Sequence, residues 1–228
     1  MGKVSENVFS EMFGKRFGLI SGKDVLRKVN LLYVFVFYLL MLYVNAWFAI
    51  NSPEFDRYSP ALYDRGFNLL SPAISPIFSD LLVNGLLGFF IIRWFLTDKL
   101  VLANYFLLLG IIFLCRVFVF MATETPSTYD KCSQKEWKRL QEWSPKHFKW
   151  ILTGSDNTTC MDNMFSGHTA HVVGVMMFTL YYSRNFLEKS VICAATFATM
   201  VSLVWSRMHY TSDVLIALLV TVGAFFTI

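Results

Sequence analysis

Charged residues are scarce in this chain. Only 16% of its 228 residues are Asp, Glu, Lys or Arg, whereas a soluble globular domain usually carries about 25%. Hydrophobic residues make up 55% of the chain, which is more apolar surface than one soluble core of this length can cover. The composition therefore excludes an ordinary soluble domain and predicts an integral membrane protein.

Cysteine is also scarce, and its spacing argues against a common kind of metal centre. The four cysteines include no C-x-x-C pair, so a zinc site is not expected. No other pattern in the chain indicates a metal or a cofactor. The chain also lacks a Lys/Arg block with interleaved aromatic residues, so a nucleic-acid partner is not expected.

Long runs without charge fill most of the remaining sequence. A helix needs about 20 apolar residues to cross a bilayer, and these runs are too long and too uniformly apolar for the strands of a barrel. The sequence therefore predicts an all-α, polytopic membrane protein with six transmembrane helices, preceded by a separate segment over residues 1–28. The predicted spans are residues 29–50, 75–96, 100–122, 167–182, 190–205 and 213–228.

Positive charges are distributed unevenly between the two sides of this arrangement. Lys and Arg gather in residues 1–28 and flank the short loops after the second and fourth spans. By the positive-inside rule that side is cytoplasmic. The long polar segment over residues 123–165 then lies on the outer or lumenal side. We expect such a protein in an endomembrane (Golgi or ER) or in the plasma membrane.

Two polar clusters lie at helix ends on the predicted outer side. His168 follows Ser166 and Gly167 at the start of the fourth span, and His209 and Asp213 lie at the entry to the sixth span, about forty residues later. Because the fourth and fifth spans form a hairpin, both clusters return to the same membrane face.

The residue types in these clusters indicate transfer at phosphorus. His209 and Asp213 are four positions apart, so on a helix they share a face, and the carboxylate can fix the imidazole tautomer so that the other nitrogen can attack. His168 lies at a helix start, where backbone N–H groups favour a phosphate. One histidine can act as the nucleophile while the other protonates the leaving alkoxide.

Other polar residues near the spans receive different interpretations. Arg116 lies within a span, where a charge is costly, so a functional role is expected. Arg207 lies close enough to His209 to approach a phosphate. Asp80 and Arg93 lie nearer to span ends and are interpreted as interfacial residues. His171, one turn after His168, is interpreted as structural.

These motifs carry a resemblance to a known family. The sequence strings resemble the sphingomyelin synthase family, within the wider lipid phosphate phosphatase (PAP2) group. The matching residues are Phe165-Ser166-Gly167-His168-Thr169, His209-Tyr210-Thr211, Asp213-Val214, and the set Arg116, Thr123 and Pro126.

The resemblance implies a PAP2-like helical bundle whose catalytic domain covers residues 29–228, with the active site on the outer face. It implies that His209 is the nucleophile, that Asp213 orients it, and that His168 is the acid and then the base. Phosphatidylcholine would be the donor, ceramide the acceptor and diacylglycerol the product, without metal or cofactor. The remaining candidates for binding substrate or phosphate are Arg116, Asp162, Ser166, Gly167, Tyr210, Arg207, Glu136 and Glu142.

Several alternatives remain open at this point. Glu136 and Glu142 are both candidates for a family carboxylate in the long loop, and Met161 replaces the family's usual glycine. Inositol- or ethanolamine-phosphoceramide synthesis, or transfer of phosphocholine to diacylglycerol, would use the same three catalytic residues. A lipid phosphatase is disfavoured because its Lys-x6-Arg-Pro motif is absent. A membrane scaffold is disfavoured by the intact histidines and aspartate. A homo-oligomer is compatible with all of these readings.

Overall fold

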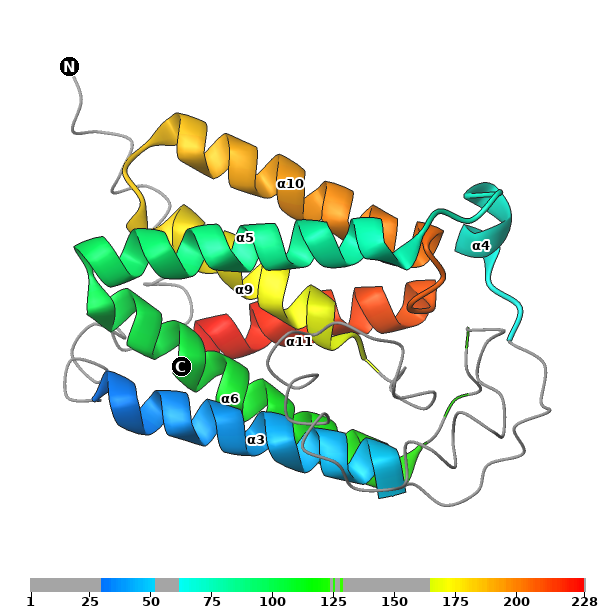
Figure 1. The fold of residues 1–228 in the computed structure, drawn as a ribbon, viewed down its shortest axis with the longest axis horizontal. Helices are drawn as coiled ribbons and strands as arrows, with labels where there is room; N and C mark the ends of the chain where they lie inside the picture. The colour runs from blue at the N-terminus through cyan, green and yellow to red at the C-terminus, as the bar shows by residue number, and fades with distance from the viewer. Residues whose placement is uncertain (1–29, 52–61, 124, 126–127, 129–164, 228) are drawn as a thin grey trace.

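All regular structure in the described part of the chain is helical (Figure 1). The computed structural model describes residues 30–51, 62–123, 125, 128 and 165–227. For these residues the prediction of an all-α fold is confirmed. The predicted segment over residues 1–28 and most of the predicted outer segment lie outside them. The helices are α3 (Leu31–Asn51), α4 (Arg65–Leu69), α5 (Pro76–Thr97), α6 (Lys99–Ala122), α9 (Gly167–Tyr182), α10 (Phe186–Trp205) and α11 (Thr211–Thr227).

The long helices lie side by side and alternate in direction along the chain (Figure 1). α9 is central, because it packs against α5, α6, α10 and α11. Its residues suit that place: Val172, Val173 and Val175 are fully buried, and Gly174 leaves room for the ring of Tyr105 from α6. This arrangement brings the starts of α5, α9 and α11 and the end of α10 to the same end of the bundle.

Four helices are long and apolar enough to cross a membrane by length and composition, namely α3, α5, α6 and α10. The apolar α11 covers 17 residues and α9 covers 16, so both are shorter than a typical span. The protein is therefore a multi-pass membrane protein. The count of six spans and the orientation in the membrane remain predictions.

The helix bounds follow the predicted spans closely, with one larger difference. α9 covers residues 167–182, as predicted for the fourth span. α10, however, begins at Phe186 and not at residue 190. Asn185 caps it by accepting hydrogen bonds from the N–H groups of Leu187 (2.9 Å) and Glu188 (3.3 Å). The prediction was wrong here because it treated the charges as loop, although an acidic residue is favourable in a first helical turn.

α3 packs chiefly against α6, and the contact depends on Gly110. A Cβ atom at Gly110 would lie 2.5 Å from two ring carbons of Phe37, so only glycine lets this ring rest on α6. Further along α3, the buried Asn45 donates a hydrogen bond to the carbonyl of Phe113 in α6 (2.7 Å). Close packing at Gly110 and the polar contact of Asn45 thus both help to fix α3 against α6.

Candidate active site

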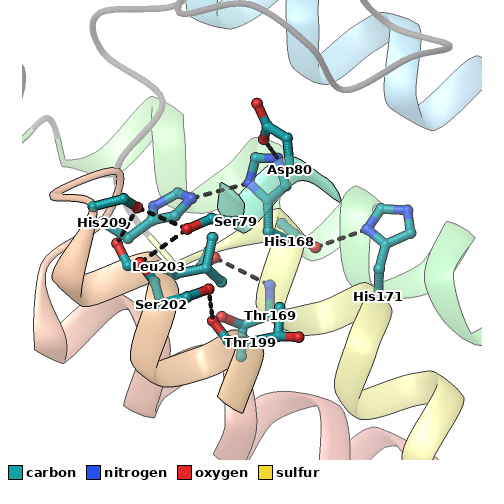
Figure 2. A network of polar contacts seen from close by, with 12 residues as sticks. Ser79, Asp80, His168, Thr169, His171, Thr199, Ser202, Leu203 and His209 are labelled. Carbon is teal, nitrogen blue, oxygen red and sulfur yellow. Dashed lines mark hydrogen bonds and ion pairs between the residues drawn. The ribbon is translucent and has the colours of Figure 1, made fainter. Parts of the chain in front are cut away.

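Two histidine rings face each other at the end of the bundle where α9 begins (Figure 2). His168 is the second residue of α9, and its Nδ1 lies 3.3 Å from Nε2 of His209. The ring centroids are 5.6 Å apart. His209 is buried at 4% exposure, whereas the side chain of His168 is 24% exposed. The structure therefore brings together the two predicted histidines, and one of them remains accessible.

Ser166 explains why α9 starts at this place. Its Oγ accepts a hydrogen bond from the N–H of Thr169 (3.1 Å), which is the bond of a helix N-cap. The N–H of Ser166 donates to the carbonyl of Asp213 (3.2 Å), so the start of α9 is joined to the start of α11. Ser166 thus has a structural role here, and its contact with phosphate stays a prediction.

Gly167, the first residue of α9, packs closely against α6. A Cβ atom at this position would lie 3.3 Å from Phe113 and 3.4 Å from Nη1 of Arg116. An added side chain would therefore slightly crowd Phe113, while the guanidinium of Arg116 already lies at contact distance from the first turn of α9. The close approach of phosphate to this backbone stays a prediction.

His209 lies on a turn and not on a helix, which corrects the helical spacing assumed from the sequence. α10 ends in a Schellman motif, in which the N–H of Met208 donates to the carbonyl of Leu203 (3.1 Å) and that of Arg207 to the carbonyl of Val204 (3.0 Å). Arg207 takes the left-handed position of this motif with φ of 56°, where glycine is usual. The turn, rather than a helix face, presents the ring of His209 to His168.

Asp213 is buried at 1% exposure and stabilises the start of α11. Its Oδ2 accepts a hydrogen bond from the N–H of Tyr210 (3.1 Å), while its own N–H donates to the carbonyl of Tyr210 (3.1 Å). The first of these bonds, from an N-cap N–H to the side chain three residues later, is one half of a capping box, and the second is a backbone bond of the first turn. Asp213 therefore fixes the residue that follows His209 in the sequence. Its proposed direct role on the imidazole stays a prediction.

Asp80 belongs to the site, contrary to its interpretation as an interfacial residue. Its Oδ1 lies 3.9 Å from Nε2 of His168, so the two groups form an ion pair when the imidazole is protonated. The preceding residue, Ser79, is fully buried, and its Oγ lies 2.9 Å from both the carbonyl of Ser202 and Oγ of Ser206. These bonds fix the first turn of α5 against the end of α10 and so hold Asp80 beside His168 (Figure 2).

Arg116 is buried next to the first turn of α9, and its expected functional role stays a prediction. It is 3% exposed, and its Nε donates to the carbonyl of Phe165 (2.8 Å). The guanidinium lies 5.7 Å from the ring centroid of Phe113 and 6.0 Å from that of Phe165. A cation is thus held beside the helix N-terminus that carries His168, where it can add to the attraction for an anion.

The segment over residues 62–75 packs over the His209 turn. The hydroxyl of Tyr210 accepts from the N–H of Leu62 (3.0 Å), and the ring of Tyr210 stacks on Phe67 at a centroid distance of 5.6 Å. The guanidinium of Arg207 lies 5.7 Å from the centroid of the same Phe67 ring. Tyr210 and Arg207 therefore take part in packing this segment, and their contacts with substrate stay predictions.

Asp64 is the polar centre of this packing, and sequence reasoning missed it. Its carboxylate accepts from the N–H of Gly66 (2.7 Å) and from both the N–H (2.6 Å) and the hydroxyl (2.7 Å) of Thr211. Burial alone raises the pKa of Asp64, but the hydrogen bonds from Thr211, Gly66 and Phe67 outweigh burial and lower the pKa below its usual value. The sequence signal that could have found it is an Asp at the N-cap of a short helix.

Three predicted site residues lie outside the described residues, namely Asp162, Glu136 and Glu142. Within the described residues, no group of three or more His, Cys, Asp and Glu side chains is arranged to hold a metal ion. The charged and titratable groups closest to the two facing imidazoles thus include the carboxylates of Asp80 and Asp213 and the guanidinium of Arg116.

Comparison with known proteins shows a similarity over the C-terminal third of the chain. Residues 159–228 match the family described as PAP2 superfamily C-terminal. This region contains α9, α10 and α11, and with them both histidines and Asp213.

Longer matches link the chain to enzymes that act on ceramide. It is 27% identical over 124 residues to the phosphatidylinositol:ceramide inositolphosphotransferase of Trypanosoma cruzi, covering 54% of this chain and 37% of that protein. It is 26% identical over 122 residues to the phosphatidylethanolamine:ceramide ethanolaminephosphotransferase of Trypanosoma brucei brucei (52% and 37%). It is 28% identical over 176 residues to the phosphatidylcholine:ceramide cholinephosphotransferase 2 of Mus musculus (72% and 48%).

The chain spans less than half the length of these curated relatives. The matched names differ in the head group and agree in the ceramide acceptor and in the transfer of a phosphate-linked group. The resemblance that the sequence motifs indicated is therefore confirmed: the C-terminal part of the chain is similar to the PAP2 superfamily C-terminal family, and longer stretches are similar to ceramide phosphotransferases.

Proposed function

We propose that the protein transfers a phosphate-linked head group from a glycerophospholipid to ceramide and releases diacylglycerol. The observation that carries this proposal is the pair of imidazoles at 3.3 Å, one buried and one accessible. Such a pair supplies a nucleophile and an acid within reach of one phosphorus atom. The similarity to three ceramide phosphotransferases supports the acceptor.

In the first half of the proposed reaction, Nε2 of His209 forms a bond to phosphorus while the bond from phosphorus to the diacylglycerol oxygen breaks. Nδ1 of His168 gives its proton to that oxygen, and diacylglycerol leaves. In the second half, His168 takes the proton of the ceramide hydroxyl, whose oxygen then forms a bond to phosphorus. The bond from phosphorus to His209 breaks, and both histidines return to their initial state.

The two carboxylates have different parts in this scheme. Asp213 holds the N–H of Tyr210 and orients His209 for attack. Asp80, at 3.9 Å from His168, balances the positive charge of the protonated imidazole. Each histidine is thus given one acidic partner, an arrangement that suits one ring to attack and the other to carry a proton.

Arg116 and the first turn of α9 are proposed to hold the phosphate oxygens. The N-terminal N–H groups of a helix favour an anion, and the guanidinium lies beside Gly167. Ser166, Gly167, Tyr210 and Arg207 complete the set proposed from the sequence, with Asp162 and one of Glu136 and Glu142 from the outer segment.

We propose choline as the head group, with inositol and ethanolamine as the alternatives. The longest of the three matches described above, over 176 residues, is to a cholinephosphotransferase, and an acidic residue such as Asp162 would attract the choline cation. The catalytic groups act on phosphorus and so do not distinguish these head groups. The active site is proposed to face the lumen or the cell exterior, with the N-terminus in the cytoplasm.

The test is a transfer assay with the purified protein, labelled ceramide and one phospholipid donor at a time. We expect a head-grouped ceramide with phosphatidylcholine and its loss in His209→Ala and His168→Ala, while Asp98→Asn at the opposite end of α5 remains active. Product with another donor alone would replace choline by that head group. Release of only water-soluble phosphate or phosphocholine would indicate a hydrolase and contradict the proposal.

A further inference from the structure

A third histidine, which the proposed reaction does not use, is bonded through both ring nitrogens. Nδ1 of His171 lies 2.7 Å from the carbonyl oxygen of Gly167, and Nε2 lies 2.7 Å from the hydroxyl of Tyr38 in α3. The ring packs near Tyr38 at 5.9 Å and Phe113 at 5.3 Å between centroids. A chain of two short hydrogen bonds therefore runs from α3 to the peptide that precedes His168.

The direction of these bonds follows from the chemistry of the groups. A carbonyl oxygen can only accept, so Nδ1 of His171 carries the hydrogen that is donated to Gly167. In the neutral ring Nε2 is then an acceptor, and the hydroxyl of Tyr38 donates to it. Both donors, the hydroxyl of Tyr38 and Nδ1–H of His171, thus point toward the start of α9.

The carbonyl at the end of this series of hydrogen bonds is that of Gly167. It belongs to the same peptide unit as the N–H of His168. The two groups are conjugated through the planar peptide bond. A donor on the carbonyl therefore polarises the unit and strengthens its N–H as a hydrogen-bond donor, because hydrogen bonds in series reinforce one another. That N–H lies in the first turn of α9, where a phosphate is proposed to bind.

We propose that Tyr38 and His171 are a positioning pair that orients and polarises the Gly167–His168 peptide for binding the transferred phosphate. The proposal rests on the proposed function, since it assumes a phosphate at the N-terminus of α9. It assigns to α3 a part in the reaction, although α3 carries neither of the two facing histidines.

The variants separate the hydrogen bonds from the packing. Tyr38→Phe removes only the hydroxyl and keeps the ring among its aromatic neighbours. His171→Leu removes both bonds, whereas the amide of His171→Asn can still donate near the position of Nδ1. Tyr33→Phe, at an exposed position of the same helix, is the matched control. A net hydrogen bond corresponds to a change of about 2- to 12-fold.

The first measurement is transfer kinetics. We expect kcat to fall several-fold in Tyr38→Phe and further in His171→Leu, with partial recovery in His171→Asn and an unchanged KM for ceramide. A purely structural role would instead lower the amount of folded protein and leave kcat per folded molecule unchanged, and that result would overturn the proposal.

The second measurement needs no turnover and keeps the two proposals distinguishable. Binding of inorganic vanadate to the purified protein is measured by calorimetry, and we expect several-fold weaker binding in Tyr38→Phe and His171→Leu but not in Tyr33→Phe. Equal binding by all variants, or no binding to the parent protein, would refute the positioning pair even if transfer is observed. If vanadate binds as expected but no donor gives a ceramide product, the proposed function fails and the anion site stands.

Discussion

Asp64 and Thr211 are joined by two hydrogen bonds, one to the backbone N–H (2.6 Å) and one to the hydroxyl (2.7 Å), although they are 147 positions apart. The same carboxylate caps α4. One side chain thus holds the first turns of two helices and keeps the segment over residues 62–75 on the turn that carries His209.

The first prediction concerns the pH dependence of this contact. Because the pKa of Asp64 is lowered on folding, its contribution to stability is present above the usual carboxyl pKa of 3.8 and is lost as the pH falls through the lowered value. Asp64→Ala should destabilise the protein at neutral pH by about 1 kcal/mol, the usual effect of losing a cap. Thermal unfolding in detergent between pH 7 and pH 3 measures this. A difference between variant and parent that does not shrink at the acidic end would contradict the assignment.

The second prediction concerns Asp80. Asp80→Asn keeps the size of the side chain but removes the negative charge that lies 3.9 Å from His168. We expect the transfer rate to fall by about tenfold or more, with activity lost first at the alkaline end of the pH profile, because the protonated imidazole loses its partner. Asp98→Asn serves as the control in the same assay. A pH profile that is unchanged in shape would show that Asp80 does not act on His168.

The third prediction separates the backbone of Arg207 from its side chain. A non-glycine residue with a left-handed backbone is strained by about 1–2 kcal/mol, so Arg207→Gly should be more stable than Arg207→Ala by about 1 kcal/mol, as measured by thermal unfolding. Both variants lose the contact with Phe67. If the guanidinium also binds phosphate, the two variants will lose transfer activity equally. If Arg207→Gly alone keeps full activity, the predicted phosphate contact is wrong.

The fourth prediction compares two glycines in neighbouring helices. Gly110→Ala places a methyl group 2.5 Å from the ring of Phe37 and should cost about 1–3 kcal/mol. Gly88→Ala meets no atom within 4 Å and should stabilise α5 by about 0.5–1 kcal/mol. Unfolding of both variants, and of Gly110→Ala combined with Phe37→Leu, tests this. Failure of the second substitution to recover stability would mean that the ring is not the obstacle.

The sequence was most informative where local signals agree with the tertiary structure. The predicted span over residues 167–182 matches both ends of α9, where in the structure a serine N-cap precedes an uninterrupted apolar helix. That the clusters of His168 and His209 lie at the same end of the bundle followed from topology alone. These predictions needed only the length of the apolar runs and the direction of successive helices.

At other positions, no local sequence pattern indicated the tertiary structure. Arg207 stands where a helix-ending glycine would have marked the turn, so His209 was placed on a helix in error. Asp80 was interpreted as interfacial because it lies near a span end, while the reasoning that assigned function to Arg116, a charge within an apolar helix, applied to it as well. Its proximity to His168 depends on packing between α5, α9 and α10, which no local pattern reports.

The way α3 is attached bears on how the protein is made. α3 contains no charged residue and packs chiefly against α6, which leaves the ribosome well after it. An uncharged helix can remain in the lipid without a partner, whereas α6 carries the buried Arg116 and needs its neighbours. Insertion of α3 can therefore precede the assembly of the bundle, and its arrival against α6 would be a late step in the maturation of the site.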